Sequence, residues 1–158
     1  MAENAWQSGA YEKKDYPLHV RYLLSQAMAL IAGHAETIGR ESAYTDKYQR
    51  DELRIKKALL FIERNYGSSL TLEEIASSAS VSTSTCLRLF SVIVGTTPVS
   101  YLLDYRLQRA AQELQYQGDR TISEIAYLCG FTDASYFNRC FRKKYGITPT
   151  GYVRHDEK

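Results

Sequence analysis

The feature that most constrains this chain is an internal repeat of about 50 residues in its second half. Residues 71–76 (TLEEIA) correspond to residues 121–126 (TISEIA), and both have the form T-x-x-E ahead of apolar residues, which is the capping box of a helix start. Each copy continues with a tight turn, a second helical pattern and a G-x-x-P stop, at 95–98 and at 146–149. The sequence therefore predicts two copies of one unit, which consists of a helix, a three-residue turn and a second helix.

The second helix of the later copy lies in the run 130–149, GFTDASYFNRCFRKKYGITP. Its apolar residues recur at steps of three and four and predict one buried stripe: Tyr136, Phe137, Cys140, Phe141 and Tyr145. Small, hydrogen-bonding and cationic residues occupy the other side, which suits base edges and phosphates. Gly146 is expected to end the helix in the left-handed conformation. Alone, this run fits a solvated basic surface equally well.

Two such units match the plan of a helix-turn-helix, in which the first helix braces the second and the second enters the major groove. We therefore expect an all-α fold with helix-turn-helix units at about 71–94 and 121–145, joined by a spacer helix at 98–117. The spacer residues expected to face the units are Tyr101, Leu102, Tyr105, Ala110 and Leu114. At about 1.5 Å per residue the spacer is roughly 30 Å long, close to the roughly 34 Å of one DNA turn.

The part before the repeat is less informative. We expect a polar lead over residues 1–16, a separate helix at about 18–38, a linker over 39–50 and a domain boundary near residue 50. The helix at about 18–38 docks on the following domain of the same chain, forms a homodimer seam, or is the last helix of a missing effector or dimerisation domain. A further helix over 51–66 is expected to bury Leu53, Ile55, Leu59, Leu60, Ile62 and Tyr66.

Composition excludes several function classes. No apolar run approaches the roughly 20 residues that span a bilayer, so we expect no membrane association and a cytoplasmic, nucleoid-associated protein. The three cysteines (Cys86, Cys129 and Cys140) and the three histidines (His19, His34 and His155) lie far apart. We therefore expect no metal, no cofactor and no catalysis. Residues 120–150 hold five Lys+Arg against two Asp+Glu, a local net charge of +3 that fits a nucleic-acid footprint.

The run 130–149 also closely resembles the signature of the AraC/XylS family of bacterial transcription regulators. The resemblance rests on the GF turn, the SYF-x-R-x-F pattern, the basic pair and the G-x-x-P-x-x-Y ending at Tyr152, and it extends to Arg106-Leu107-x-x-Ala110 in the spacer. It covers about residues 51–154. It implies a DNA-binding domain that acts as activator or repressor, often beside a ligand-binding domain with a β-barrel core. RNA polymerase is then an expected partner besides double-stranded DNA.

The resemblance implies two sets of contacts. Base reading is expected from Ser84, Leu87 and Arg88 in the first unit and from Ala134, Ser135, Asn138 and Arg139 in the second. Phosphate contacts are expected from Thr71, Thr121, Arg142, Lys143 and Lys144, although the two threonines also fit plain helix caps.

The first unit departs from the family pattern. It has Ser91-Val92-Ile93-Val94 where basic residues are usual, and residues 71–100 hold one Arg against two Glu, a net charge of −1. We therefore expect the second unit to supply most of the affinity. An alternative function is a protein-interaction module derived from this fold with weak or no DNA binding.

Overall fold

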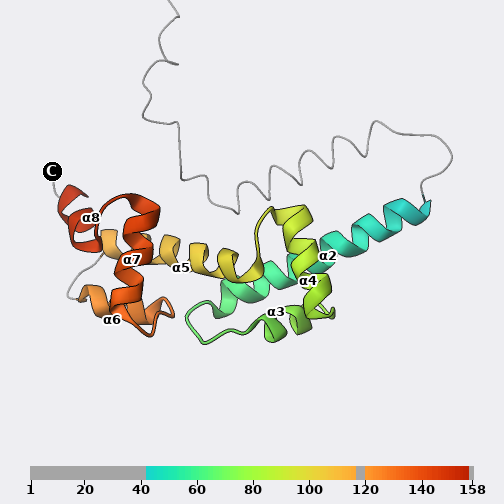
Figure 1. Cartoon of the computed structure of the whole chain (residues 1–158), viewed down its shortest axis with the longest axis horizontal. Helices are drawn as coiled ribbons and strands as arrows, with labels where there is room; N and C mark the ends of the chain where they lie inside the picture. The colour runs from blue at the N-terminus through green and yellow to red at the C-terminus, as the bar shows by residue number, and fades with distance from the viewer. Residues whose placement is uncertain (1–41, 117–119, 157–158) are drawn as a thin grey trace, which may run out of the picture.

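The computed structural model describes residues 42–116 and 120–156, and all regular secondary structure in these ranges is helical (Figure 1). The elements are α2 (Ser42–Asn65), α3 (Leu72–Ser78), α4 (Thr83–Leu89) with its continuation η1 (Phe90–Val94), α5 (Pro98–Gln115), α6 (Ile122–Leu128), α7 (Ala134–Tyr145) and α8 (Pro149–Asp156). The all-α class and both helix-turn-helix units are thus confirmed. The helix expected at about 18–38 lies outside the described residues.

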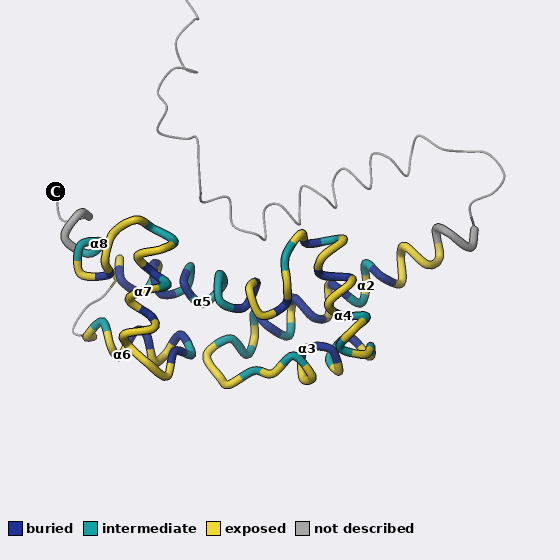
Figure 2. Tube along the Cα trace, in the orientation of Figure 1, coloured by how far each residue is buried: buried dark blue, intermediate teal, exposed yellow. Residues whose placement is uncertain are grey.

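Helix α5 joins two separate hydrophobic cores (Figures 1 and 2). Its first half contributes Tyr101 and Leu102 to a core shared with α2, α3, α4 and η1. Its second half contributes Leu107, Ala110 and Leu114 to a core shared with α6 and α7, against which α8 packs. The expected spacer helix is therefore confirmed, and each of its halves packs against one helix-turn-helix unit.

Local signals start and stop the helices as the sequence predicts. Thr71 and Thr121 form capping boxes, in which each hydroxyl accepts from the backbone N–H three residues on. Ser82 and Asp133 cap α4 and α7 in the same way, through their side-chain oxygens. Gly146 ends α7 with φ +80°, in the left-handed conformation expected of it. These caps frame both reading helices closely.

The first reading helix differs from the second at its end. After Leu89 the backbone widens into the π-helical turn η1, in which the Gly95 N–H donates to the Phe90 carbonyl five residues back, at 2.9 Å. Phe90 and Val94 are both buried, so the wider turn keeps both side chains in the first core. The single helix expected up to residue 94 is therefore two helical forms in series.

Three expectations about α2 and α7 were wrong. Helix α2 is continuous over Ser42–Asn65, so the boundary expected near residue 50 and the described part of the linker expected over 39–50 fall inside a helix; residues 42–50 contain no Gly or Pro to stop it. Leu53 and Leu60 are 58% and 40% exposed, because only the stripe through Ile55 and Ile62 faces the first core. Tyr136 is 46% exposed at the edge of the second core.

No single helix in the described ranges is long and apolar enough to cross a membrane. One bent pair, Thr83–Val94 with Pro98–Gln115, meets the length and composition criteria; its first member packs into the first core and its second member into both cores.

Candidate DNA interface

The exposed face of α4 carries the three residues expected to read bases in the first unit. Ser84, Leu87 and Arg88 are all exposed, while Cys86 and Leu89 on the opposite side are 2% exposed and hold the helix to its core. Residues three and four apart share one face of a helix, so these three side chains form one short surface. Leu87, which is 39% exposed, makes this surface partly apolar.

Arg88 is engaged by the protein itself. Its Nη2 lies 3.5 Å from Oδ2 of Asp51, whose side chain is only 11% exposed and whose other oxygen bonds Arg54 at 3.1 Å. The Arg88 side chain remains 54% exposed, so part of its guanidinium faces solvent. A base contact by Arg88 therefore competes with, or is aimed by, a carboxylate on α2.

The exposed face of α7 is longer and more polar. Ala134, Ser135, Asn138 and Arg139 are all exposed along one side, opposite the fully buried Phe137 and Phe141. The guanidinium of Arg139 lies 6.0 Å from the centre of the Tyr136 ring. Among the described residues Arg139 has no ion pair, in contrast to Arg88. The structure thus brings all four expected side chains of the second unit onto one accessible surface.

The basic end of α7 divides into two parts. Arg142 and Lys143 are exposed on its last turn, as a phosphate contact requires. Lys144 is only 15% exposed, and its Nζ donates to both the carbonyl and the carboxylate of Asp104 on α5, each at 3.1 Å. Lys144 therefore holds α7 to the spacer helix, and its positive charge is already paired with Asp104.

Thr71 and Thr121 act as caps. Each threonine N–H donates to the glutamate three residues on, at 2.8 Å to Glu74 and 2.7 Å to Glu124, and each hydroxyl bonds the same carboxylate. The bond from the Thr121 N–H lowers the pKa of Glu124, so this carboxylate stays charged. A negative charge at each helix start works against a phosphate there.

Metal binding and thiol chemistry depend on where the His, Cys, Asp and Glu side chains of the described ranges lie. No three His, Cys, Asp or Glu side chains there lie close enough to hold a metal ion. Cys86 and Cys129 are buried free thiols, and burial raises the pKa of Cys129 to about 11. These two thiols behave as small apolar core residues.

The comparisons with known proteins agree with this geometry. A family model described as a helix-turn-helix domain matches residues 75–155. A transcriptional regulator from Chromobacterium violaceum with an AraC-type DNA-binding domain superposes with a TM-score of 0.62 at 32% identity, over 66% of this chain and 93% of that one. A DNA-binding transcriptional dual regulator from Escherichia coli K-12 gives a TM-score of 0.60 at 31% identity, over 66% and 92%.

The chain belongs to the AraC/XylS family. The uncharacterized regulator YdeC of Bacillus subtilis is 34% identical over 112 residues, which are 68% of this chain and 38% of that protein. The chain spans less than half the length of the curated AraC/XylS relatives it matches.

Two residues near the site escaped the sequence reasoning. Asp51, the partner of Arg88, entered the sequence analysis only as the first residue of the helix expected over 51–66. Arg106 was noted solely as part of the AraC/XylS spacer pattern, yet it bonds the loop before α3. Neither contact has a periodic signal, because the partners lie 37 to 40 residues apart in the sequence.

Proposed function

We propose that this domain is a sequence-specific DNA-binding module of a transcription regulator and that it reads two successive major-groove segments on one face of the duplex. The observation that supports this most directly is that α4 and α7 lie at the two ends of α5 (Figure 1) and that each has an exposed face. With 18 residues, α5 is about 27 Å long at about 1.5 Å per residue, which is near one turn of DNA.

The chemistry of α7 suits base reading. Arg139 can offer two donors to a guanine edge, and Asn138 can pair with adenine through its amide. Ala134 and Ser135 lie at the start of the helix, where a small side chain lets the backbone approach the bases and a methyl can meet a thymine methyl. Arg142 and Lys143 are placed to neutralise phosphates and to fix the register of the helix.

The chemistry of α4 gives this unit a smaller share of the affinity. Ser84 discriminates bases weakly, Leu87 offers only apolar contact with a thymine methyl, and Arg88 is shared with Asp51. Arg139, Arg142 and Lys143 on α7 have no ion pair among the described residues, whereas Arg88 is the only Lys or Arg of the stretch 71–100, so counterion release comes mainly from the second unit.

The same proposal covers the protein's wider role. As an AraC/XylS member it is expected to act in the cytoplasm, on the nucleoid, by activating or repressing transcription in contact with RNA polymerase. The segment at about 18–38 is the proposed homodimer contact. The domain needs no catalytic step, cofactor or metal for this role.

A protein-interaction module is the second candidate function. It is favoured by the apolar surface where α4 and η1 meet α2: Val92 is 73% exposed, Leu87 is 39% exposed, and a groove of about 220 Å³ beside them is lined in part by Tyr48 and Ile93. An apolar groove of this kind fits a partner protein better than it fits a phosphate backbone.

Fluorescence anisotropy distinguishes the two functions. The probe is a duplex that the wild-type chain selects from a random library, titrated at low and at moderate salt. DNA recognition predicts that a duplex is selected and that its tight binding weakens steeply with salt, whereas failure to select any duplex supports the interaction module.

Single substitutions then test the division between the units. Arg139→Ala is expected to weaken binding about tenfold, and Arg88→Ala by less, because Arg88 is paired with Asp51 whereas Arg139 has no ion pair among the described residues. Arg64→Ala, an exposed arginine in the last turn of α2 and outside both reading helices, is the control for loss of one charge. A larger loss for Arg88→Ala than for Arg139→Ala contradicts the proposed division.

A further inference from the structure

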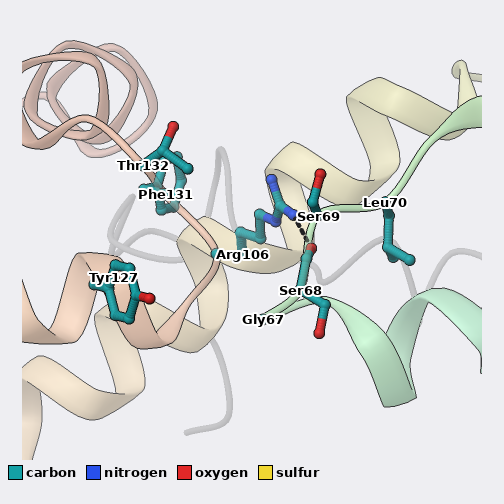
Figure 3. Close-up of a pocket in the computed structure, with 9 residues that line it drawn as sticks. Gly67, Ser68, Ser69, Leu70, Arg106, Tyr127, Phe131 and Thr132 are labelled. Atoms are coloured by element: carbon teal, nitrogen blue, oxygen red, sulfur yellow. Dashed lines mark hydrogen bonds between the residues drawn. The ribbon is translucent and has the colours of Figure 1, made fainter.

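Arg106 lies in the middle of α5 and bonds the loop that joins α2 to α3. Its Nε donates to the carbonyl of Tyr66 at 2.8 Å, and its Nη2 donates to the carbonyl of Ser68 at 2.7 Å. Figure 3 shows the side chain reaching from α5 to this loop. One guanidinium thereby fixes two backbone groups of the first unit to the spacer.

The same guanidinium also meets the turn of the second unit. A β-carbon built on Gly130 would lie 2.8 Å from Nε and 2.9 Å from Cζ of Arg106, and 2.5 Å from the Tyr66 carbonyl oxygen. On the other side of the contact, a β-carbon on Gly67 would lie 2.8 Å from the carbonyl oxygen of Leu128. The two turns at this contact, the α2–α3 loop (66–71) and the α6–α7 turn (129–133), therefore touch backbone to backbone, with Arg106 between them.

The surroundings of this contact are partly dry. Burial lowers the pKa of the Arg106 guanidinium, because it loses water and gains only carbonyl oxygens in return. The ring of Tyr66 packs against both hydrophobic cores and lies 5.2 Å from that of Tyr105. A cleft of about 410 Å³, lined by Arg106 and by residues of both loops, opens beside the contact (Figure 3).

Few other groups connect the two units. In the described ranges, every extensive helix-to-helix contact lies within one unit or involves α5. A single spacer helix sets the relative orientation of the two units only loosely, because a helix can bend over several turns. The angle between α4 and α7 therefore depends on what braces the spacer, and the contact around Arg106 is the brace that touches both turns.

We propose that Arg106 is a positioning residue that fixes the angle between the two reading helices, so that binding depends strictly on the spacing of the two half-sites. The consequence for spacing rests on the proposed DNA-binding function; the fixed angle does not. A residue that only stabilised the fold would change overall affinity or melting temperature, but it would not change how binding depends on spacing.

The DNA experiment compares the selected duplex with the same duplex lengthened by one base pair between its half-sites. For the wild-type chain the insertion turns and shifts one half-site, and we expect a loss of about tenfold or more as the two units cease to bind together. For Arg106→Gln we expect a loss of about threefold or less, with affinity for a duplex carrying only the second half-site unchanged. Lys57→Gln, an exposed residue on α2, is the control and should behave as wild type.

The second experiment needs no DNA. Residual dipolar couplings of backbone amides in weakly aligned protein report the orientation of each unit. The wild-type couplings of both units should fit one alignment tensor, and those of Arg106→Gln should require two. Arg106→Lys serves if the glutamine variant does not fold, because lysine keeps the charge and stem but cannot bond both carbonyls as a fork.

The outcomes separate the two proposals. If the wild-type chain selects no duplex, the proposed function fails, and the couplings still decide whether Arg106 fixes the angle. Equal spacing penalties for wild type and variant, or one shared tensor in the variant, overturn the role of Arg106 and leave the function standing.

Discussion

Replacing Gly130 by alanine tests the contact between the two turns directly, because the structure supplies a control for each part of the expected cost. Gly130 has φ +84° and no room for a β-carbon. Gly95 and Gly146 have nearly the same φ, +78° and +80°, with nothing within 4 Å of a β-carbon. Gly67 has the close contact without the left-handed backbone. The four positions thus separate backbone strain from collision.

The expected magnitudes follow from these two contributions. A left-handed backbone costs a non-glycine residue about 1–2 kcal/mol, which is the whole expected cost for Gly95→Ala and Gly146→Ala. Overpacking against fixed backbone costs about 1–3 kcal/mol, which is the expected cost for Gly67→Ala. Gly130→Ala should suffer both, about 2–5 kcal/mol in the free energy of unfolding. The loss of chain entropy that alanine brings to the unfolded state is common to all four and cancels in the comparison.

The assay is urea unfolding followed by circular dichroism, with the slope m checked for constancy. Thermal melts should place the Gly130→Ala midpoint about 2–12 °C below that of Gly146→Ala, because the two variants differ by the overpacking part alone and 1 kcal/mol shifts the midpoint of a chain of this size by about 2–4 °C. If Gly130→Ala is no less stable than the variants at Gly95 and Gly146, the two turns do not touch as described. The role assigned to Arg106 then loses its geometric basis.

The remaining predictions concern caps and thiols. Thr121→Ala should lower the free energy of unfolding by about 1 kcal/mol, measured by urea titration, because α6 loses its cap. Glu124 has a folded pKa below its ordinary 4.5, so its contribution is complete above that pH and is lost as the pH falls through the folded pKa; Glu124→Gln should therefore flatten the acid side of the stability profile, and an unchanged profile would contradict this. In the native protein a thiol reagent should modify the half-buried Cys140 first, and Cys86 and Cys129 only upon unfolding, because burial raises both of their pKa values.

The repeat made much of this fold predictable, because its signals are local. A capping box, a left-handed glycine and a T-P helix start each act within a few residues, so Thr121, Gly146 and Pro149 could be read without any tertiary knowledge. The buried stripe of α7 was predictable for the same reason, since Phe137 and Phe141 lie one turn apart and both are fully buried.

What the sequence left open depends on contacts between distant segments. Lys144 and Arg142 carry the same charge in the same basic run, yet Lys144 meets Asp104, 40 residues away, and Arg142 faces solvent. Leu53 continues the apolar spacing of α2 and is nevertheless exposed. Whether a residue in such a pattern is buried depends on whether another helix packs against that face. Charge and periodicity describe one helix, whereas burial is decided by its neighbours.

The asymmetry between the two units has a structural counterpart that charge counting alone does not give. Each unit presents an arginine at the same position of its reading helix, but Asp51 holds Arg88, and Tyr136 stacks beside an otherwise unpaired Arg139 within the described ranges. If Arg106 fixes the angle between the units, then docking α7 through its stronger contacts also delivers α4 to the adjacent groove in a set orientation. The first unit can then contribute specificity although its own contacts are weak, since docking of α7 already incurs the loss of translational and rotational entropy for both units.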